Sequence, residues 1–243
     1  MLRTYKADLH IHTCLSPCAD LEMSPRAIAR KANEKHIDIL GICDHNSAEN
    51  VPALQEAAEP YRISILAGME IASVEEVHIL GLFDSLEAVF KLQAIVYDHL
   101  PGENDEEAFG LQVVVNAEGE VIRFNPRLLI GASTLSLEKI VDLIHSLGGL
   151  AIASHIDREG FSLIGQLGFV PDSLDIDALE VSPRVSFEEA RKKFNPRLPL
   201  TSASDAHRLE EIGLATTSFQ LERATVAELR LALRNEGGRT TLN

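Results

Sequence analysis

Two histidines separated by one residue follow the first apolar stretch of the chain, in the sequence DLHIHTCLSPC at residues 8–18. In an extended strand, residues two apart point to the same side, so His10 and His12 face one point while Leu9 and Ile11 face the other way. Neutral imidazole is a common ligand for zinc, iron and manganese. The pair is typical of a metal site, but a surface His-x-His without function is also common, so the rest of the chain has to decide.

Polar side chains of the same kinds come at the ends of later apolar stretches. They are Asp44 and His45 in ICDHN, Glu70 in GMEI, His78 in VHILGL, His155 in AIASHID, and Asp205 and His207 in SASDAH. The carboxyl ends of strands in an α/β sheet or barrel meet on one rim, so we expect these residues to lie together. They exceed the ligands of one tetrahedral site and predict two or three divalent ions, with Glu70 bridging a pair. The other histidines (His36, His99 and His145) are assigned no chemistry.

The elements that must position these residues alternate between apolar strands and amphipathic helices. Strands are expected at 5–11, 37–43, 63–71, 76–83, 150–154, 176–182 and 198–204, and helices at 24–36, 50–61, 135–149, 186–194 and 225–238. Such alternation predicts a mostly parallel sheet, open or closed into a barrel. Residues 84–134 break the rhythm, because they start as a helix and then read LQVVVNAEGEVIRF, which predicts a β-hairpin around residues 117–119. We interpret 84–134 as an insertion in a single domain of residues 1–243.

Composition limits the functional classes. The chain has 243 residues, 45% of them apolar, which suits one barrel-type domain or two small ones. No apolar run approaches the roughly 20 residues that span a bilayer, and MLRTYKADLH lacks the apolar core of a signal peptide. Three cysteines are too few for a disulfide framework, so we expect a cytoplasmic protein. The net charge of −15 argues against broad binding of duplex nucleic acid but leaves room for a small phosphorylated substrate beside metal ions.

The motifs DLHIHT, CDHN, GMEI, VHILGL, SHID and SDAH, in this order, resemble the PHP (polymerase and histidinol phosphatase) superfamily, from residue 5 to about residue 217. The resemblance implies an α/β fold, a distorted (β/α)7 TIM-like barrel of the PHP type, here with the inserted segment. It also implies a trinuclear metal site on the carboxyl rim. Family members include histidinol phosphate phosphatases, nucleotide and oligonucleotide phosphatases, and nuclease-like domains of bacterial polymerases.

Carried over motif by motif, the resemblance implies three ligand sets. The first holds His10, His12, Glu70 and Asp205, the second Glu70, His78 and His155, and the third His45, His207 and a residue of the first loop. In the matching stretch SPCAD, Pro17 cannot ligate through its side chain, so Cys18 or Asp20 must serve, or the third site is weak. Asp8 and Asp44 are expected either to orient imidazoles or to cap the turns that follow the strands.

The resulting hypothesis is a metal-dependent phosphoesterase that hydrolyses a small phosphate monoester, histidinol-phosphate-like or nucleotide-like, through a metal-bridging hydroxide. Glu70 would bridge the metals, and His207 or a metal-bound water would protonate the leaving oxygen. Arg158 either contacts the phosphate or forms a surface salt bridge with Asp157 or Glu159, and Arg184 is a weaker candidate.

Two other functions remain open. An amidohydrolase that cleaves C–N bonds would also begin with His-x-His, but such barrels use a bridging lysine, and no lysine ends a predicted strand. A non-catalytic metal-binding regulatory module would be expected to have lost ligands. The metal could be zinc, manganese or iron, since His and carboxylate ligands suit all three. The inserted segment is expected to shape the pocket or a contact in a homo-oligomer.

Overall fold

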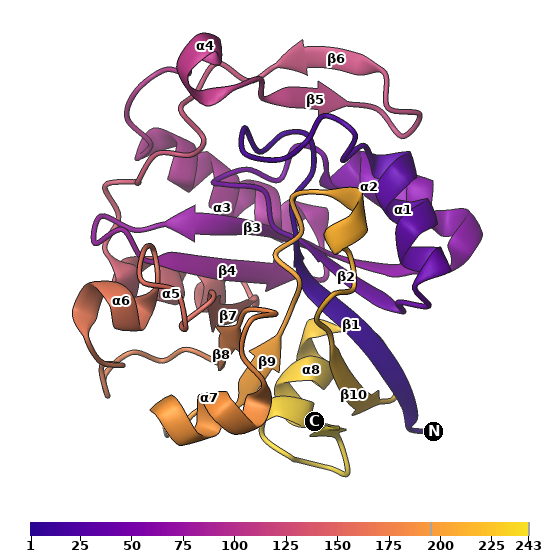
Figure 1. Ribbon diagram of the computed structural model, residues 1–243, viewed down its shortest axis with the longest axis vertical. Helices are drawn as coiled ribbons and strands as arrows, with labels where there is room; N and C mark the ends of the chain where they lie inside the picture. Colours follow the sequence, from indigo (N-terminus) through magenta and orange to yellow (C-terminus); the bar gives the residue numbers. More distant parts are fainter. Residues whose placement is uncertain (195, 243) are drawn as a thin grey trace.

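The computed structural model describes residues 1–194 and 196–242, which form one curled sheet with helices packed around it (Figure 1). The nine strands of this sheet lie in the order β11-β10-β1-β2-β3-β4-β7-β8-β9. Their bounds are β1 Arg3–Ile11, β2 Ile39–Ile42, β3 Ser64–Ala72, β4 His78–Phe83, β7 Leu150–Ala153, β8 Ala178–Val181, β9 Leu200–Ser202, β10 Thr217–Leu221 and β11 Thr240–Thr241. The α-helices are α1 Pro25–Glu34, α2 Val51–Ala58, α3 Leu86–Asp98, α4 Glu106–Phe109, α5 Leu137–Ser146, α6 Leu163–Leu167, α7 Phe187–Phe194 and α8 Val226–Leu233. Short 3-10 turns, η1 Glu59–Tyr61 and η2 Leu209–Glu211, follow α2 and β9.

The direction of the strands departs from a regular barrel. β1, β2 and β3 run parallel, as do β7, β8 and β9, but β4 is antiparallel to both β3 and β7. The sheet curls at the carboxyl ends of its parallel strands. There Ile11 forms a parallel bridge with Ala206, and the amide of His12 donates to the carbonyl of Ala206 at 3.0 Å. The predicted α/β class is confirmed. The count of seven in the predicted distorted (β/α)7 barrel is not confirmed, because β4 is reversed and, within the described residues, β1 meets the chain after β9 through a bridge rather than a ladder.

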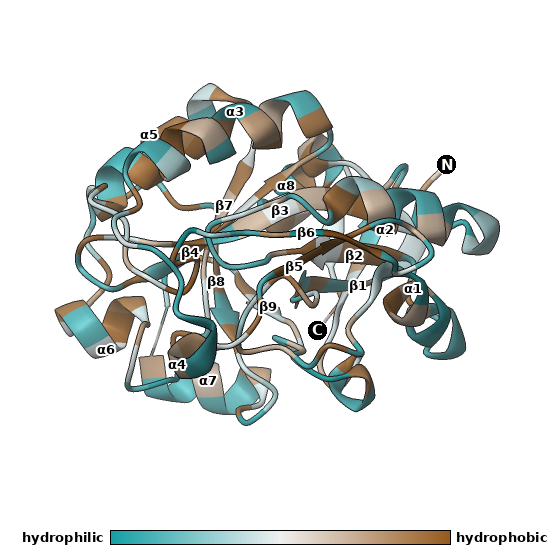
Figure 2. Ribbon diagram, turned by 90° about the horizontal axis from the view of Figure 1, so that it is seen from above, coloured by the Kyte–Doolittle hydropathy of each residue, from teal (hydrophilic) through white to brown (hydrophobic). Residues whose placement is uncertain are grey.

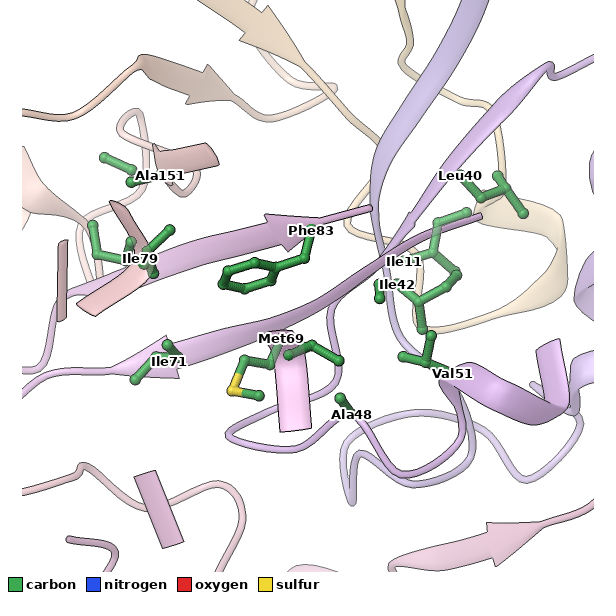
Figure 3. Packing of buried hydrophobic residues seen from close by; sticks show 14 of the residues in the cluster. Ile11, Leu40, Ile42, Ala48, Val51, Met69, Ile71, Ile79, Phe83 and Ala151 are labelled. Carbon is green, nitrogen blue, oxygen red and sulfur yellow. The ribbon is translucent and has the colours of Figure 1, made fainter. Parts of the chain in front are cut away.

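Alternate residues of the strands belong to two buried hydrophobic clusters, one on each face of the sheet. In β4, Ile79 and Phe83 face the cluster under the helices, where Ile42 and Met69 also pack (Figure 3). Leu80 belongs to a second cluster on the other face of the sheet. Because side chains alternate along a strand, His78 shares the face of Leu80. The polar site therefore lies at one end of an otherwise apolar face.

The helices cover the first cluster with their apolar sides. α2 packs on β3, α3 on β3 and β4, and α5 on β4 and β7. Figure 2 shows apolar and polar residues alternating along α3 and α5, as expected for helices with one buried face. In α1, Ser24 occupies the N-cap position and Pro25 opens the helix, as predicted from the sequence. No helix in the described part of the chain combines the length and apolar character needed to cross a membrane.

The stretch 84–134 contains the predicted helix, α3, and the predicted hairpin, formed by β5 (Val113–Val115) and β6 (Val121–Phe124). Gly119 in the turn has φ +89°, in the left-handed region that favours glycine. The hairpin and α4 lie above the sheet, at the top of Figure 1. Asn50, just past His45, donates to the carbonyl of Val113 at 3.0 Å and accepts from the amide of Val115 at 3.0 Å. The hairpin is thereby attached to the loop that carries His45.

Candidate metal centre

The predicted ligands come from separate strand ends and converge on one buried region. His10 and His12 end β1, His45 follows β2 and forms a parallel bridge with Glu70 of β3, and His155, Asp205 and His207 follow β7 and β9. His78 opens β4 and pairs with Ala72, so the reversed strand brings its first residue to the same rim. All of these side chains are buried except His207, which is partly exposed.

Glu70 lies at the centre of this region, 1% exposed and surrounded by imidazoles. The distances to its carboxylate oxygens are 3.0 Å from Nδ1 of His78, 3.1 Å from Nδ1 of His45, 3.2 Å from Nε2 of His155, 3.4 Å from Nε2 of His10 and 3.6 Å from Nε2 of His12. Burial alone would raise the pKa of Glu70, but His78 and His10 hold that pKa well below its usual value. An ionised carboxylate with both oxygens surrounded by nitrogen ligands is suited to bridge two cations.

Asp205 is the second carboxylate of the region. Its Oδ1 lies 3.1 Å from Nε2 of His12 and 3.2 Å from Nε2 of His10. Although burial acts to raise the pKa of Asp205, His10 and His12 hold it well below its usual range. The backbone of Asp205 has φ +49°, which turns the chain after β9 toward β1.

Three groups of side chains bring their ligand atoms within 4.8 Å of one another: His10, His12 and Asp205; His45, Glu70 and His78; and His12, His45 and His207. The first group contains three of the four ligands expected for the first metal. The second pairs Glu70 and His78 with His45, whereas the resemblance implied His155, which nevertheless lies against Glu70. The third contains the two expected histidines together with His12. Cys18 is in none of these groups.

The chemistry of these donors fits divalent cations. Nε2 of His10 and Nε2 of His12 lie 3.1 Å apart and point toward the same space. Within the described residues, buried atoms without a hydrogen-bond partner include Oε1 of Glu70, Nδ1 of His78 and Nδ1 of His155. Burial lowers the pKa of His12 to about 4, which keeps the ring in its neutral, metal-binding form. A cation among these atoms would provide the partner that they lack.

Hydrogen bonds on the far side of the rings fix their orientation. Ser16 Oγ lies 2.9 Å from Nδ1 of His12 and donates to Asp44 at 2.7 Å. Asp44 also accepts from the amide and hydroxyl of Thr13, both at 2.7 Å. Asp44 therefore acts on an imidazole through Ser16 and fixes the first loop at the same time.

Asp8 does not orient an imidazole, which was one of the two roles expected from the sequence. Its carboxylate accepts from the amides of Ser204 and Gly213, both at 2.9 Å, and no imidazole is among its contacts in the described part of the chain. Asp8 anchors the segment that carries Asp205 and does not orient a ligand directly.

Glu180 is a functional candidate that the sequence analysis missed. It lies in β8, 1% exposed, with Oε1 at 2.9 Å from Nδ1 of His10 and 3.3 Å from the amide of His155. The signal was present in the stretch DALEVS, where one carboxylate stands inside an otherwise apolar strand. A buried acid of this kind needs a partner, which here is a candidate metal ligand.

Cys18 and Asp20 lie in the first loop, where the sequence left the last ligand open. Cys18 is exposed and lines a cleft above the candidate ligands. The thiol itself is partly shielded from water, and this shielding, together with the negative charge of Glu70, raises the pKa of the thiol to about 12. Asp20 instead lies 3.6 Å from Nε of Arg208, and its side chain is 56% exposed. Of the two residues, Cys18 is the one that borders the cleft.

The cleft has a volume of about 1070 Å³, and Arg158, Arg184, Asp205 and His207 are among the residues that line it. Arg158 forms neither of the surface salt bridges considered from the sequence, because its NH2 lies 2.5 Å from Oδ2 of Asp205. Asp157 instead accepts from the amide and hydroxyl of Ser182. Arg158 thus extends into the candidate metal centre.

The three histidines without predicted chemistry lie elsewhere. His36 is an exposed residue just after α1, and His99 caps α3, with Nδ1 at 2.9 Å from the carbonyl of Ile95. His145 in α5 lies 2.9 Å from Asp177. All three lie outside the group of candidate ligands, with local structural contacts or solvent around them.

The chain matches two family models: the one described as PHP domain at residues 8–164 and the one described as PHP-associated at residues 190–236. A 5'-3' exoribonuclease of Haemophilus influenzae is 32% identical over 82 residues, which cover 32% of this chain and 29% of that protein. An uncharacterized protein of Methanocaldococcus jannaschii is 33% identical over 86 residues, covering 32% of this chain and 50% of that one.

Among solved structures, the lesion-specific endonuclease Q of Pyrococcus furiosus superposes with a TM-score of 0.72 and 21% identity, over 98% of this chain and 58% of the endonuclease. A structure of endonuclease Q with a 27-mer duplex carrying an abasic lesion at its active site gives a TM-score of 0.71. These structural matches show a shared fold. The matched regions span at most about half of the two curated relatives and 58% of the endonuclease.

Proposed function

Because the chain belongs to the PHP family, we propose that it is a metal-dependent phosphoesterase. The observation that carries the proposal is the position of Glu70, a buried carboxylate with the nitrogens of five histidines within 3.6 Å of its oxygens. Histidine and carboxylate donors around a bridging acid are suited to a cluster of divalent ions.

The proposed ligand sets combine the groups described above with the residues that the family resemblance adds. His10, His12 and Asp205 would hold one ion, Glu70 would be shared with a second held by His78 and His155, and His45 and His207 would hold a third with Cys18. Two or three ions of zinc, manganese or iron would supply a water nucleophile near neutral pH and neutralise the phosphate oxygens. The number and identity of the ions are part of the proposal.

Arg158 is proposed to bind the phosphate of the substrate. Its guanidinium pairs with Oδ2 of Asp205, and its side chain is 36% exposed. With a cation bound beside Asp205, the guanidinium would be available to donate two charge-assisted hydrogen bonds to a phosphate.

His207 is proposed to hand a proton to the leaving oxygen. Its Nδ1 lies 2.8 Å from the carbonyl of Asp205, which orients the ring, and its side chain is 26% exposed at the cleft. A histidine near the cleft opening is suited to general-acid catalysis because imidazole is the side chain most often used for proton transfer. Ligation of the third ion and proton transfer are alternative roles, and metal content separates them.

The proposed substrate is a small phosphate monoester, nucleotide-like or histidinol-phosphate-like. Nucleic-acid ends are a second candidate, because the matched relatives are described as an exoribonuclease and an endonuclease that was solved with duplex DNA. The net charge of −15 argues against tight binding of a long duplex, but metal ions at the cleft would reverse the charge locally. Cleavage of C–N bonds is not favoured by the family match.

The test is phosphate release from an aryl phosphate by chelator-stripped protein with added manganese, zinc or iron. We expect activity that depends on metal and is lost in a double variant, His10→Ala and His12→Ala, that retains its circular dichroism spectrum. An assay with an anilide in parallel tests the amidohydrolase alternative. Release of the amine without release of phosphate would contradict the proposal.

A further inference from the structure

Phe161 is an aromatic residue at the cleft for which the proposed chemistry gives no role. Its ring stacks on the imidazole of His78, with centroids 5.0 Å apart and planes at 26°. The side chain is 51% exposed and borders the cleft. The preceding residue, Gly160, also faces open space, since a side-chain carbon there would have no other atom within 4 Å. One part of the ring is therefore supported by a candidate ligand while the rest is open to whatever occupies the cleft.

Phe161 has a backbone conformation that is unfavourable for a bulky residue, and neighbouring hydrogen bonds hold it. Phe161 has φ +58°, in the left-handed region that bulky residues rarely adopt. Its carbonyl accepts from the amide of His78 at 3.0 Å, and the next residue, Ser162, caps α6 by accepting from the amide of Gly165 at 2.9 Å. The conformation is thus fixed on both sides. Strained residues held this firmly are characteristic of ligand-binding sites.

Other exposed phenylalanines of the described residues lie away from the cleft. Phe109 and Phe124 belong to α4 and the hairpin, and Phe169, 62% exposed, lines a separate pocket beside α6 and α7. An exposed aromatic ring in water is unfavourable unless a partner covers it, and aromatic rings are covered best by other planar groups. In the cleft the partner would be part of the substrate, because the phosphate would lie at the ions next to His78.

We propose that Phe161 is a stacking platform for a planar ring of the substrate, so that the cleft selects phosphate esters that carry such a ring over esters that do not. This inference rests on the proposed phosphoesterase function and specifies its substrate class. A nucleobase and an imidazole are the two obvious sources of a planar ring, and a purine offers the larger area for stacking.

The test compares adenosine monophosphate, histidinol phosphate and glycerol phosphate as substrates of the metal-loaded full chain. We expect the wild type to have a kcat/KM about tenfold higher for the ring-bearing esters, in line with stacking on one aromatic residue. Phe161→Leu should lower that value about tenfold through KM, and should change kcat/KM for glycerol phosphate by less than about twofold. Phe161→Tyr should retain the preference for ring-bearing esters. If Phe161→Leu loses more kcat/KM on adenosine monophosphate than on histidinol phosphate, the planar ring that stacks on Phe161 is a nucleobase.

Phe169→Leu is the matched control, because it removes an exposed ring outside the cleft. Equal losses on all three substrates in Phe161→Leu, or no loss on any, would overturn the inference. If no ester releases phosphate, the proposed function fails, and calorimetric binding of adenosine monophosphate and glycerol phosphate still decides the role of Phe161. If Phe161→Leu binds adenosine monophosphate and glycerol phosphate with the same affinities as the wild type, Phe161 is not a stacking platform.

Discussion

Oε1 of Glu180 lies 2.9 Å from Nδ1 of His10, although 170 residues separate the two in the sequence. With Nδ1–H donating to Glu180, Nε2 of His10 is directed at Glu70 and Asp205. Burial acts to lower the pKa of His10, but Glu180, Asp205 and Glu70 together raise that pKa well above its usual value. Three buried carboxylates around one imidazole thus give this position a negative charge that favours a cation.

Glu180→Gln should weaken metal binding about 10- to 100-fold, since carboxylates behind a histidine ligand orient the ring and make it more basic. The dissociation constant can be measured by competition with a chromophoric chelator. Glu159→Gln is the control, because Glu159 lines the cleft without contacting a candidate ligand in the described residues. An unchanged dissociation constant in Glu180→Gln would remove Glu180 from the metal centre.

Glu70→Gln should abolish phosphatase activity, by more than about 100-fold, while leaving the fold intact. The amide offers one neutral acceptor where a bridge needs two charged oxygens, so the variant should also bind fewer metal ions per chain. Activity and metal content by mass spectrometry check both effects, with the exposed Glu76→Gln as control. Near-normal turnover would contradict the bridging role.

Arg158→Ala should lower kcat/KM about 100-fold, the effect expected when a charge-assisted contact of ~2–3 kcal/mol is lost. Metal affinity should not fall, because removing the guanidinium frees Asp205 for an ion. Steady-state kinetics on an aryl phosphate measure the loss, and Arg197→Ala, at an exposed arginine paired with Asp172, serves as control. If kcat/KM stays unchanged, the pair with Asp205 is structural.

Cys18→Ser should cost close to one ion per chain while the remaining ions stay bound. A metal ion would deprotonate the thiol despite its raised pKa, and the soft sulfur would favour zinc or iron over manganese at that position. Asp20→Asn is the matched variant in the same loop and should keep the full metal content. Loss of the ion in Asp20→Asn alone would assign the ligand to Asp20, and no loss in either would exclude this loop.

Asp177→Asn should destabilise the protein by about 1–2 kcal/mol at neutral pH, because the Asp177 side chain, which is 4% exposed, would lose charge-assisted hydrogen bonds. Burial raises the pKa of Asp177, but hydrogen bonds from His145 and Arg230 outweigh it and lower that pKa to about 2, against an ordinary 3.8. A depressed pKa in the folded state stabilises it above pH 4 and loses that effect as pH falls from about 4 to about 2. Urea unfolding at pH 7 and in this acid range should therefore show a difference between wild type and variant that shrinks on acidification. A constant difference would show that the effect is steric.

The sequence alone was sufficient for the parts of the site that depend on local pattern. Short apolar stretches, many of them ending at a histidine or a carboxylate, predicted the strands and the residues at their carboxyl ends, because strand direction fixes where the next residues lie. This pattern places His10, His12, Glu70 and Asp205 on one rim without reference to any contact between them, and the resemblance to the PHP superfamily implies that they form one ligand set. The helix α1 was likewise readable from Ser24 and Pro25.

The tertiary structure decided what depends on contacts between distant segments. His78 reaches the site because β4 runs antiparallel to β3, and nothing within its own stretch specifies that direction. Glu180 looked like an ordinary strand residue until the curl of the sheet placed it behind His10, and the partner of Arg158 proved to be Asp205 rather than its neighbours in sequence. Side chains far apart in the chain meet only when the sheet has curled, so local periodicity carries no information about which buried charges become partners.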